Sequence, residues 1–129
     1  IENLKRKVDA GCDYLTTQMF FDNDLFYSFL AKAYSAGITV PIIPGIMPIT
    51  RAAQIKRTFT LSGSPIPAKF KRIVDRFGDN PAAMRQAGVA YATEQESALY
   101  SNGIKAVHIY SMNKPDVAKA IKDNLAGII

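Results

Sequence analysis

The apolar run from Val40 to Pro48 constrains the fold more than any other segment of the chain. Only prolines and one glycine interrupt its aliphatic residues and methionine. A strand with one face in water alternates apolar and polar residues, whereas a strand covered on both faces is apolar almost throughout. The run therefore predicts a strand of a parallel sheet that helices cover.

Helical and strand patterns alternate along the rest of the chain. Apolar residues at helical spacing predict helices at about 2–10, 23–36, 51–61, 68–77, 81–102 and 115–125, and short apolar runs predict strands at about 13–19 and 106–110. The expected N-caps are Asp22 or Asn23, Thr50 and Asn80. This order predicts an α/β fold of parallel βαβ units. Three strands cannot close a barrel, which needs eight strands and roughly 250 residues, so the sheet is either part of a barrel or a small open sheet.

The charge of the chain leaves two interpretations open. A net charge of +5 fits a solvated basic surface, and it also fits an anionic partner such as a phosphate-bearing cofactor. Nucleic acid is disfavoured because the basic residues are spread over several segments. A membrane is disfavoured too, since no apolar run approaches the ~20 residues of a membrane span. Because the first residue is Ile1 and not Met, we expect a fragment of a longer protein.

Few residue types are available for metal or redox chemistry. The single cysteine, Cys12, excludes an internal disulfide and fits a reducing compartment. His108 is the only histidine, which excludes a multi-histidine metal site. It shares strand parity with Tyr110, and we interpret it as a core histidine.

Polar side chains follow the predicted strands, where parallel α/β folds bind their ligands. Gln18 ends the first strand, Gln54 lies in the first turn after the second, and Lys114 follows the third. An amide both donates and accepts hydrogen bonds, so Gln18 suits a flat heterocycle with mixed edges. Phe20 and Phe21 could stack on such a ligand, although alternation sends at least one of them into packing. These side chains could grip a polar ring and a carboxylate, but they form no nucleophile–base pair.

The first helix carries a second polar group. Asn3, Arg6 and Lys7 are three or four residues apart and share one face of that helix. These residues fit a solvated helix end, and they also fit a binding site for a pyrophosphate.

Four segments together resemble the catalytic domain of methylenetetrahydrofolate reductases of the bacterial type. They are LKRKVDAG (4–11), TQMFFD (17–22), PIIPGIMP (41–48) and HIYSMN (108–113). The resemblance implies a flavin-dependent (β/α)8 TIM barrel in which residues 1–129 are the C-terminal half and the N-terminal half is absent. It implies FAD as cofactor, NADH or NADPH as electron donor, and reduction of 5,10-methylenetetrahydrofolate to 5-methyltetrahydrofolate. It also implies a cytoplasmic homo-oligomer.

The resemblance assigns roles to individual residues. The positions that match FAD contacts are Asn3, Arg6, Lys7 and Thr16, and the positions that match the folate pocket are Gln18, Gln54, Met112 and Lys114. Gln18 matches the glutamine that hydrogen-bonds the pterin ring. Met112 and Lys114 stand where the family usually has leucine and arginine.

The resemblance places the family's acidic residues in the missing half of the barrel. We therefore assign no catalytic residue to this chain and expect it to be inactive without the N-terminal half of the same barrel. Two other classes remain open. The chain could be a non-catalytic scaffold or subunit-interface piece, or a basic module that binds anionic partners.

Overall fold

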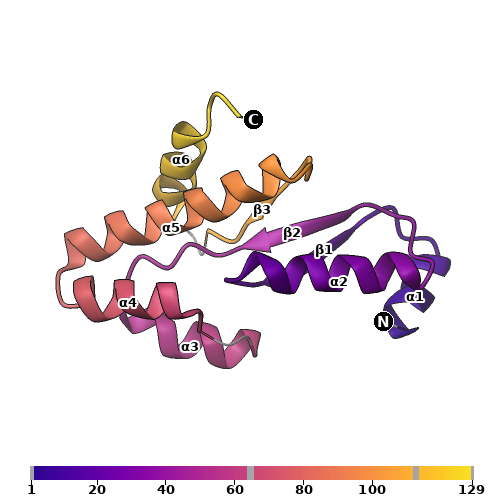
Figure 1. Cartoon of the computed structure of the whole chain (residues 1–129), viewed down its shortest axis with the longest axis horizontal. Coiled ribbons are helices and arrows are strands. Elements are labelled where there is room, and N and C mark those ends of the chain that lie inside the picture. Colours follow the sequence, from indigo (N-terminus) through magenta and orange to yellow (C-terminus); the bar gives the residue numbers. More distant parts are fainter. Residues whose placement is uncertain (1, 64–65, 112–113, 129) are drawn as a thin grey trace.

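A computed structural model describes residues 2–63, 66–111 and 114–128. The elements are α1 (Glu2–Asp9), β1 (Leu15–Met19), α2 (Asn23–Ser35), β2 (Ile42–Ile46), α3 (Ala53–Ser62), α4 (Ala68–Phe77), α5 (Pro81–Ser101), β3 (His108–Ile109) and α6 (Pro115–Asn124). The strands form one parallel sheet in the order β1-β2-β3. Figure 1 shows α2 and α5 beside the strands, with α1 at one end and the pair α3 and α4 at the other. The predicted α/β class, with parallel strands flanked by helices, is confirmed.

Local capping accounts for several helix ends. The Asp22 carboxylate accepts a hydrogen bond from the backbone N–H of Asp24 at 2.9 Å, and Asn80 accepts one from Ala83 at 3.2 Å. Both side chains satisfy donors that the first helical turn leaves unpaired. Gly63 ends α3 in the left-handed conformation with φ of 66°, where a side chain would be strained.

The predicted N-cap at Thr50 is wrong. Helix α3 begins at Ala53, and its N-cap, Ala52, makes no side-chain hydrogen bond. The side-chain oxygen of Gln54 instead reaches back and accepts hydrogen bonds from the backbone N–H groups of Thr50 and Arg51, at 3.1 and 3.2 Å. This amide thus fixes the turn that leads into α3, whereas a hydroxyl cap at Thr50 would have accepted from N–H groups two or three residues further on.

The pairing of β1 with β2 contains a bulge. Thr16 pairs with Ile43 and Met19 pairs with Gly45, so two residues of β1 lie opposite Pro44 alone. Proline has no N–H to give to the ladder, which accounts for the break at this point. The same residue helps to explain why β3 is shorter than the predicted 106–110. Continuing the Gly45–His108 register would set residue 107 opposite Pro44.

Helices cover one face of the sheet, which we call the outer face. Strand residues Ile42 and Ile46 are buried there, with Ile109 partly buried beside them. Two residues of α6 and its C-cap complete this cluster in agreement with the predicted helical spacing; they are Val117, Ile121 and Leu125. A second cluster forms where α3, α4 and α5 meet; its buried members are Phe21, Ile49, Phe70 and Met84.

Phe20 and Phe21 pack in different clusters. The Phe20 ring stacks on Phe26 with centroids 5.3 Å apart, whereas Phe21 lies 4.5 Å from Phe59. Alternation along the chain sends the two rings to opposite sides. Both are buried, so in this chain neither is open to stack on a ligand.

The opposite face of the sheet, which we call the inner face, is open. Thr16 and His108 are exposed there. The interpretation of His108 as a core residue is therefore wrong. Its ring meets Tyr110 edge-on with centroids 4.5 Å apart, on a face that no described helix covers. Parity correctly predicted that the two side chains share one side of the strand, but it could not predict what covers them.

Candidate functional site

The carboxyl ends of parallel strands meet at one edge of a sheet, and we call that edge the rim. Gln18 reaches it from β1, Gln54 and Lys114 from the segments after β2 and β3. In Figure 1 the arrow of β2 points to this edge, towards α3 and α4. The fold thus places three polar residues that are far apart in the sequence at the same edge of the sheet.

Gln18 lies on the bulge of β1 and is exposed. Its side chain lines a cleft of about 430 Å³ that also involves Thr16, Leu4 of α1 and Phe29 of α2. Most of the cleft wall is apolar, and Gln18 supplies an amide that can both donate and accept. Five consecutive residues from Thr16 to Phe20 line the cleft, so it follows the edge of β1 that has no neighbouring strand among the described residues.

The side-chain amide of Gln54 uses its oxygen, but not its amino group, in hydrogen bonds within the described part of the protein. Its oxygen accepts the two backbone hydrogen bonds that begin α3, while its amino group has no partner among the residues the structure describes. The two bonds hold the side chain at the rim. The amino group remains available to donate to a ligand.

Lys114 borders a pocket of about 330 Å³ at the same rim. Arg51 and Arg85 line this pocket too, with Asp116 as its acidic residue. Arg85 and Asp116 form an ion pair at 3.1 Å, and this hydrogen bond lowers the pKa of the Asp116 carboxyl. The ammonium of Lys114 has no ion-pair partner within the described ranges. The pocket therefore has an excess of positive charge and suits a carboxylate or phosphate.

No local sequence signal marks Arg85 and Asp116 as rim residues. They are separated by 31 positions, and each belongs to an ordinary charged helix face. Helix packing brings them together. Met112, the remaining predicted folate residue, lies outside the described residues.

The predicted FAD residues of α1 lie at a distance from this basic pocket. Asn3, Arg6 and Lys7 are all exposed. Figure 1 shows α1 at the end of the molecule away from α3 and α4. Leu4 connects this helix to the cleft that Thr16 and Gln18 line. Of the predicted FAD residues, Thr16 lines this cleft together with Gln18, whereas Asn3, Arg6 and Lys7 lie exposed on α1. Gln54 and Lys114 belong to the segments after the other two strands.

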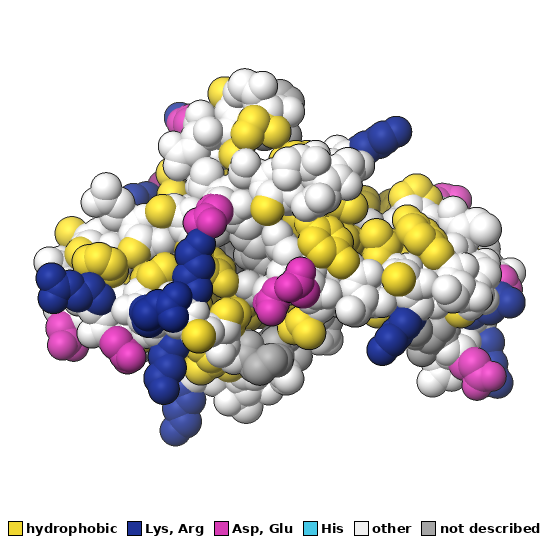
Figure 2. Space-filling model, viewed as in Figure 1, with side chains coloured by type: hydrophobic (Ala, Val, Ile, Leu, Met, Phe, Trp, Pro, Cys, Tyr) yellow, Lys and Arg dark blue, Asp and Glu magenta, His cyan; other side chains and the backbone are white. Residues whose placement is uncertain are grey.

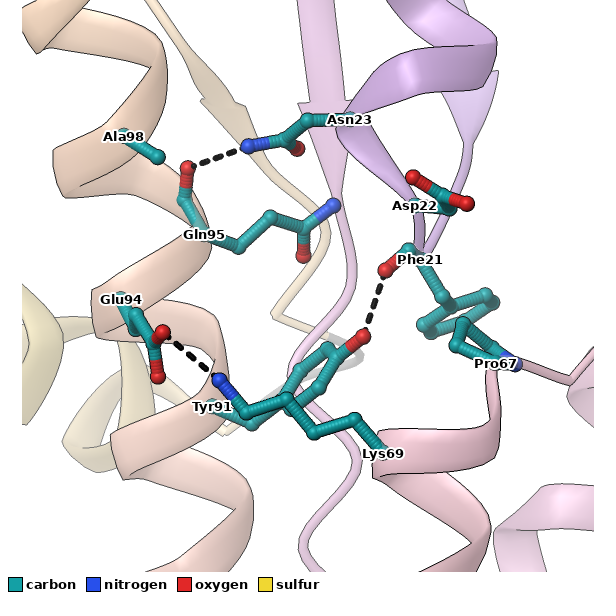
Figure 3. A pocket seen from close by; sticks show the side chains of 9 residues that line it. All are labelled: Phe21, Asp22, Asn23, Pro67, Lys69, Tyr91, Glu94, Gln95 and Ala98. Carbon is teal, nitrogen blue, oxygen red and sulfur yellow. Dashed lines mark hydrogen bonds and ion pairs between the residues drawn. The ribbon is translucent and has the colours of Figure 1, made fainter.

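Another pocket, of about 300 Å³, lies on the outer side between α2, α4 and α5 (Figure 3). The Tyr91 hydroxyl donates to the carbonyl of Phe21 at 2.6 Å, and the Asn23 amide donates to the carbonyl of Gln95 at 3.1 Å. Lys69 and Glu94 form an ion pair across its mouth. Burial raises the pKa of Tyr91 to about 12. These bonds tie the segment after β1 to α5, and we interpret them as structural support for the rim.

The surface is uneven in charge. Figure 2 shows Lys and Arg side chains gathered over α3 and α4, while apolar side chains are open to solvent over α2. Within the ranges given above, no cluster of three or more His, Cys, Asp or Glu side chains could hold a metal ion. None of the described helices is long and apolar enough to cross a membrane.

Comparison with known proteins identifies similar sequences over almost the whole chain. The family model for methylenetetrahydrofolate reductase matches residues 1–126. Methylenetetrahydrofolate reductase (NADH) 1 of Zea mays is 40% identical over 122 residues, which are 95% of this chain and 21% of that protein. The 5,10-methylenetetrahydrofolate reductase of Escherichia coli K12 is 36% identical over 119 residues, which are 92% of this chain and 40% of that protein. The chain thus spans between a fifth and two-fifths of these relatives.

Proposed function

Since the chain belongs to the methylenetetrahydrofolate reductase family, we propose that it is the C-terminal half of a flavin-dependent (β/α)8 barrel. The complete barrel would reduce 5,10-methylenetetrahydrofolate to 5-methyltetrahydrofolate with electrons from NADH or NADPH. One observation carries the proposal: Gln18, Gln54 and Lys114 lie at the carboxyl edge of three parallel strands, where such barrels bind substrate.

Each rim residue has a distinct role in this proposal. Gln18 pairs with the mixed donor and acceptor edge of the pterin ring, because its amide offers both functions. Gln54 donates from its free amino group while its oxygen stays fixed to the start of α3. Lys114 and the positive charge around it hold a carboxylate at the far end of the folate. The chain therefore binds and orients the substrate.

The residues around α1 fit the chemistry of FAD. Arg6 and Lys7 are exposed cations that suit a diphosphate, and Asn3 and Thr16 can hydrogen-bond ribose or ring atoms. When bound, FAD supplies the hydride-transfer chemistry between the nicotinamide donor and the folate. The residues of this chain would hold and orient it.

The rest of the barrel completes the proposal. Pairing within the described residues leaves one edge of β1 and one edge of β3 without a neighbouring strand, and the inner face is open. Unpaired strand edges favour pairing with further strands. We assign this place to the N-terminal half of the same barrel, which would also supply the acid that protonates the folate. A cytoplasmic homo-oligomer belongs to the same proposal.

The test uses the complete polypeptide that contains these residues, purified with FAD. Stopped-flow absorbance would follow flavin reduction by NAD(P)H and flavin reoxidation by the folate as separate half-reactions. Gln18→Glu should slow folate-dependent reoxidation by about tenfold or more, because a carboxylate cannot donate the amide's hydrogen bond. Flavin reduction should stay close to the wild-type rate.

The matched control is Gln86→Glu, the same change at an exposed position of α5. It should leave both half-reactions unchanged. If Gln18→Glu impairs only flavin reduction, the pterin role of Gln18 is wrong. A complete polypeptide that binds no flavin and instead binds nucleic acid in a salt-sensitive manner would support the basic-module alternative and contradict the proposed function.

A further inference from the structure

We propose that Tyr110 is a positioning residue, whose hydroxyl holds the bulge of β1 and thereby presents Gln18 to the substrate ring. This inference rests on the proposed function, because it concerns the residue assigned to the pterin. It joins two segments that are 93 positions apart in the sequence.

The bulge of β1 arises opposite Pro44, and it leaves the bulged residues without regular strand pairing. Pro44 cannot donate to the ladder, so Thr17 and Gln18 together face one residue of β2. A bulge re-aims the side chains that it carries, and it also interrupts the regular pairing that would fix them. Gln18 therefore needs support from outside the ladder to keep one orientation.

Two hydrogen bonds to Thr17 provide that support. The Tyr110 hydroxyl donates to the backbone carbonyl of Thr17 at 2.8 Å. The backbone N–H of Gly45 donates to the Thr17 hydroxyl at 2.9 Å. Thr17 directly precedes Gln18, so both bonds fix the peptide from which the Gln18 side chain projects.

Close packing fixes the Tyr110 ring itself. A Cβ atom at Gly45 would lie 2.5 Å from Cε2 of Tyr110 and 2.7 Å from the Thr17 carbonyl oxygen. The ring thus crosses β2 where glycine leaves room for it, and His108 meets it edge-on from β3. With the ring confined in this way, the hydroxyl has little freedom to leave the Thr17 carbonyl.

The outer side of the sheet supplies a second fixed point. The side-chain amide of Gln95 donates to the carbonyl of Phe20 at 2.9 Å. Gln18 and Met19 therefore lie between two anchored residues, Thr17 and Phe20. A side chain that is already oriented loses less entropy when it binds a ligand, which strengthens binding.

The experiment compares folate binding by variants of the complete, FAD-loaded protein. Tyr110→Phe removes the hydroxyl and keeps the ring. It should weaken binding of 5-methyltetrahydrofolate, measured by calorimetry, by about 3- to 10-fold. KM for the folate should rise by a similar factor, while the rate of flavin reduction by NAD(P)H stays within about twofold of wild type. Thr17→Val removes the hydrogen bond from the Gly45 N–H and should also weaken folate binding. It provides an independent test if Tyr110→Phe folds poorly.

A double-mutant cycle tests whether Tyr110 acts through Gln18. In a Gln18→Ala background, Tyr110→Phe should cause no further loss of folate binding. Tyr27→Phe is the matched control, since it removes a tyrosine hydroxyl that accepts a hydrogen bond from Asn102, away from the rim. It should leave folate binding unchanged.

Two results would overturn the inference. One is unchanged folate binding by both Tyr110→Phe and Thr17→Val. The other is an equal loss from Tyr110→Phe with and without Gln18. In either case a wild-type protein that still reduces the folate leaves the proposed function intact, whereas a wild-type protein that binds no folate contradicts both.

Discussion

A Cβ atom added to Gly88 would lie 1.9 Å from the carbonyl oxygen of Ile49. Helix α5 therefore packs backbone against backbone on the segment that follows β2. Ile49 is almost completely buried, and the next residue, Thr50, donates to the Gln54 side chain at the rim. The place of α5 and the geometry of the rim are thus coupled through one close contact.

Gly88→Ala should destabilise the complete protein by about 2–3 kcal/mol, since a backbone carbonyl cannot move aside as a flexible side chain can. It should also weaken folate binding by displacing the start of α3. Gly127→Ala is the control, because nothing lies within 4 Å of the added methyl group. Urea unfolding measures both variants, and equal midpoints for the two would contradict the close packing.

Glu96→Gln should stabilise the protein at neutral pH. Glu96 is 5% exposed, its Oε2 atom has no hydrogen-bond partner among the described residues, and burial raises its pKa above 4.5. A carboxyl whose pKa is raised by folding favours the folded state fully below the unfolded pKa, and this contribution is lost as the pH rises through the folded pKa. The stability gain from Glu96→Gln should therefore grow between about pH 4.5 and pH 7.

Urea unfolding across this pH range provides the measurement. The control is Glu94→Gln on the same helix, where the carboxylate is exposed and paired with Lys69. This variant should lose at most about 1 kcal/mol of stability. A stability gain from Glu96→Gln that is the same at pH 4 and pH 7 would contradict the prediction.

Tyr91 should make the protein sensitive to alkaline pH. Its folded pKa of about 12 lies above the ordinary value of 10.0, mainly because of burial. The protonated Tyr91 side chain therefore favours the folded state fully below the unfolded pKa. This contribution to stability is lost as the pH rises from 10 towards 12. Tyr91→Phe should lower stability at pH 8 by about 1 kcal/mol through the lost bond to the Phe21 carbonyl, and it should flatten the alkaline decline. Thermal unfolding of the wild type and Tyr91→Phe at pH 8 to 11 measures both effects. If stability declines equally steeply with pH in the two proteins, Tyr91 is not the cause of the decline.

Lys114→Ala should weaken folate binding by the complete protein by about tenfold, because the rim pocket loses a cation that has no ion-pair partner among the described residues. Lys114→Arg should keep the affinity, since guanidinium retains the charge and can bind a carboxylate with two donors. Lys105→Ala, an exposed change elsewhere, should have no effect. Calorimetry at low and high salt measures these affinities. Equal losses from Lys105→Ala and Lys114→Ala would show that net charge, and not the site, is responsible.

Much of the secondary structure could be predicted because its causes are local. The Asp22 and Asn80 caps bond to N–H groups two and three residues away, and the spacing of Val117 and Ile121 places them on one helix face. The N-cap assigned to Thr50 failed because α3 begins two residues later than expected, at Ala53. Sequence spacing alone did not show that Gln54 would bind the N–H groups of Thr50 and Arg51.

Some features of the candidate site could likewise be predicted from the sequence, and others could not. The parallel direction of the strands followed from the alternation of strands and helices, and it was enough to place Gln18, Gln54 and Lys114 at one edge. The spatial order β1-β2-β3 came from the structure. The ion pair of Arg85 with Asp116 could not be predicted, because it depends on how α5 packs beside α6. The assignment of the predicted residues to FAD or to folate stays a prediction.

The order of the elements, most of their ends and the parallel class of the sheet follow from local patterns, since each depends on contacts within a few residues or on burial. The effect of Pro44 emerges only in the folded sheet. Its missing N–H becomes a bulge only beside β1, where the hydroxyl of Tyr110 reaches across Gly45 to the Thr17 carbonyl. Such relationships depend on register and packing, which no local pattern encodes.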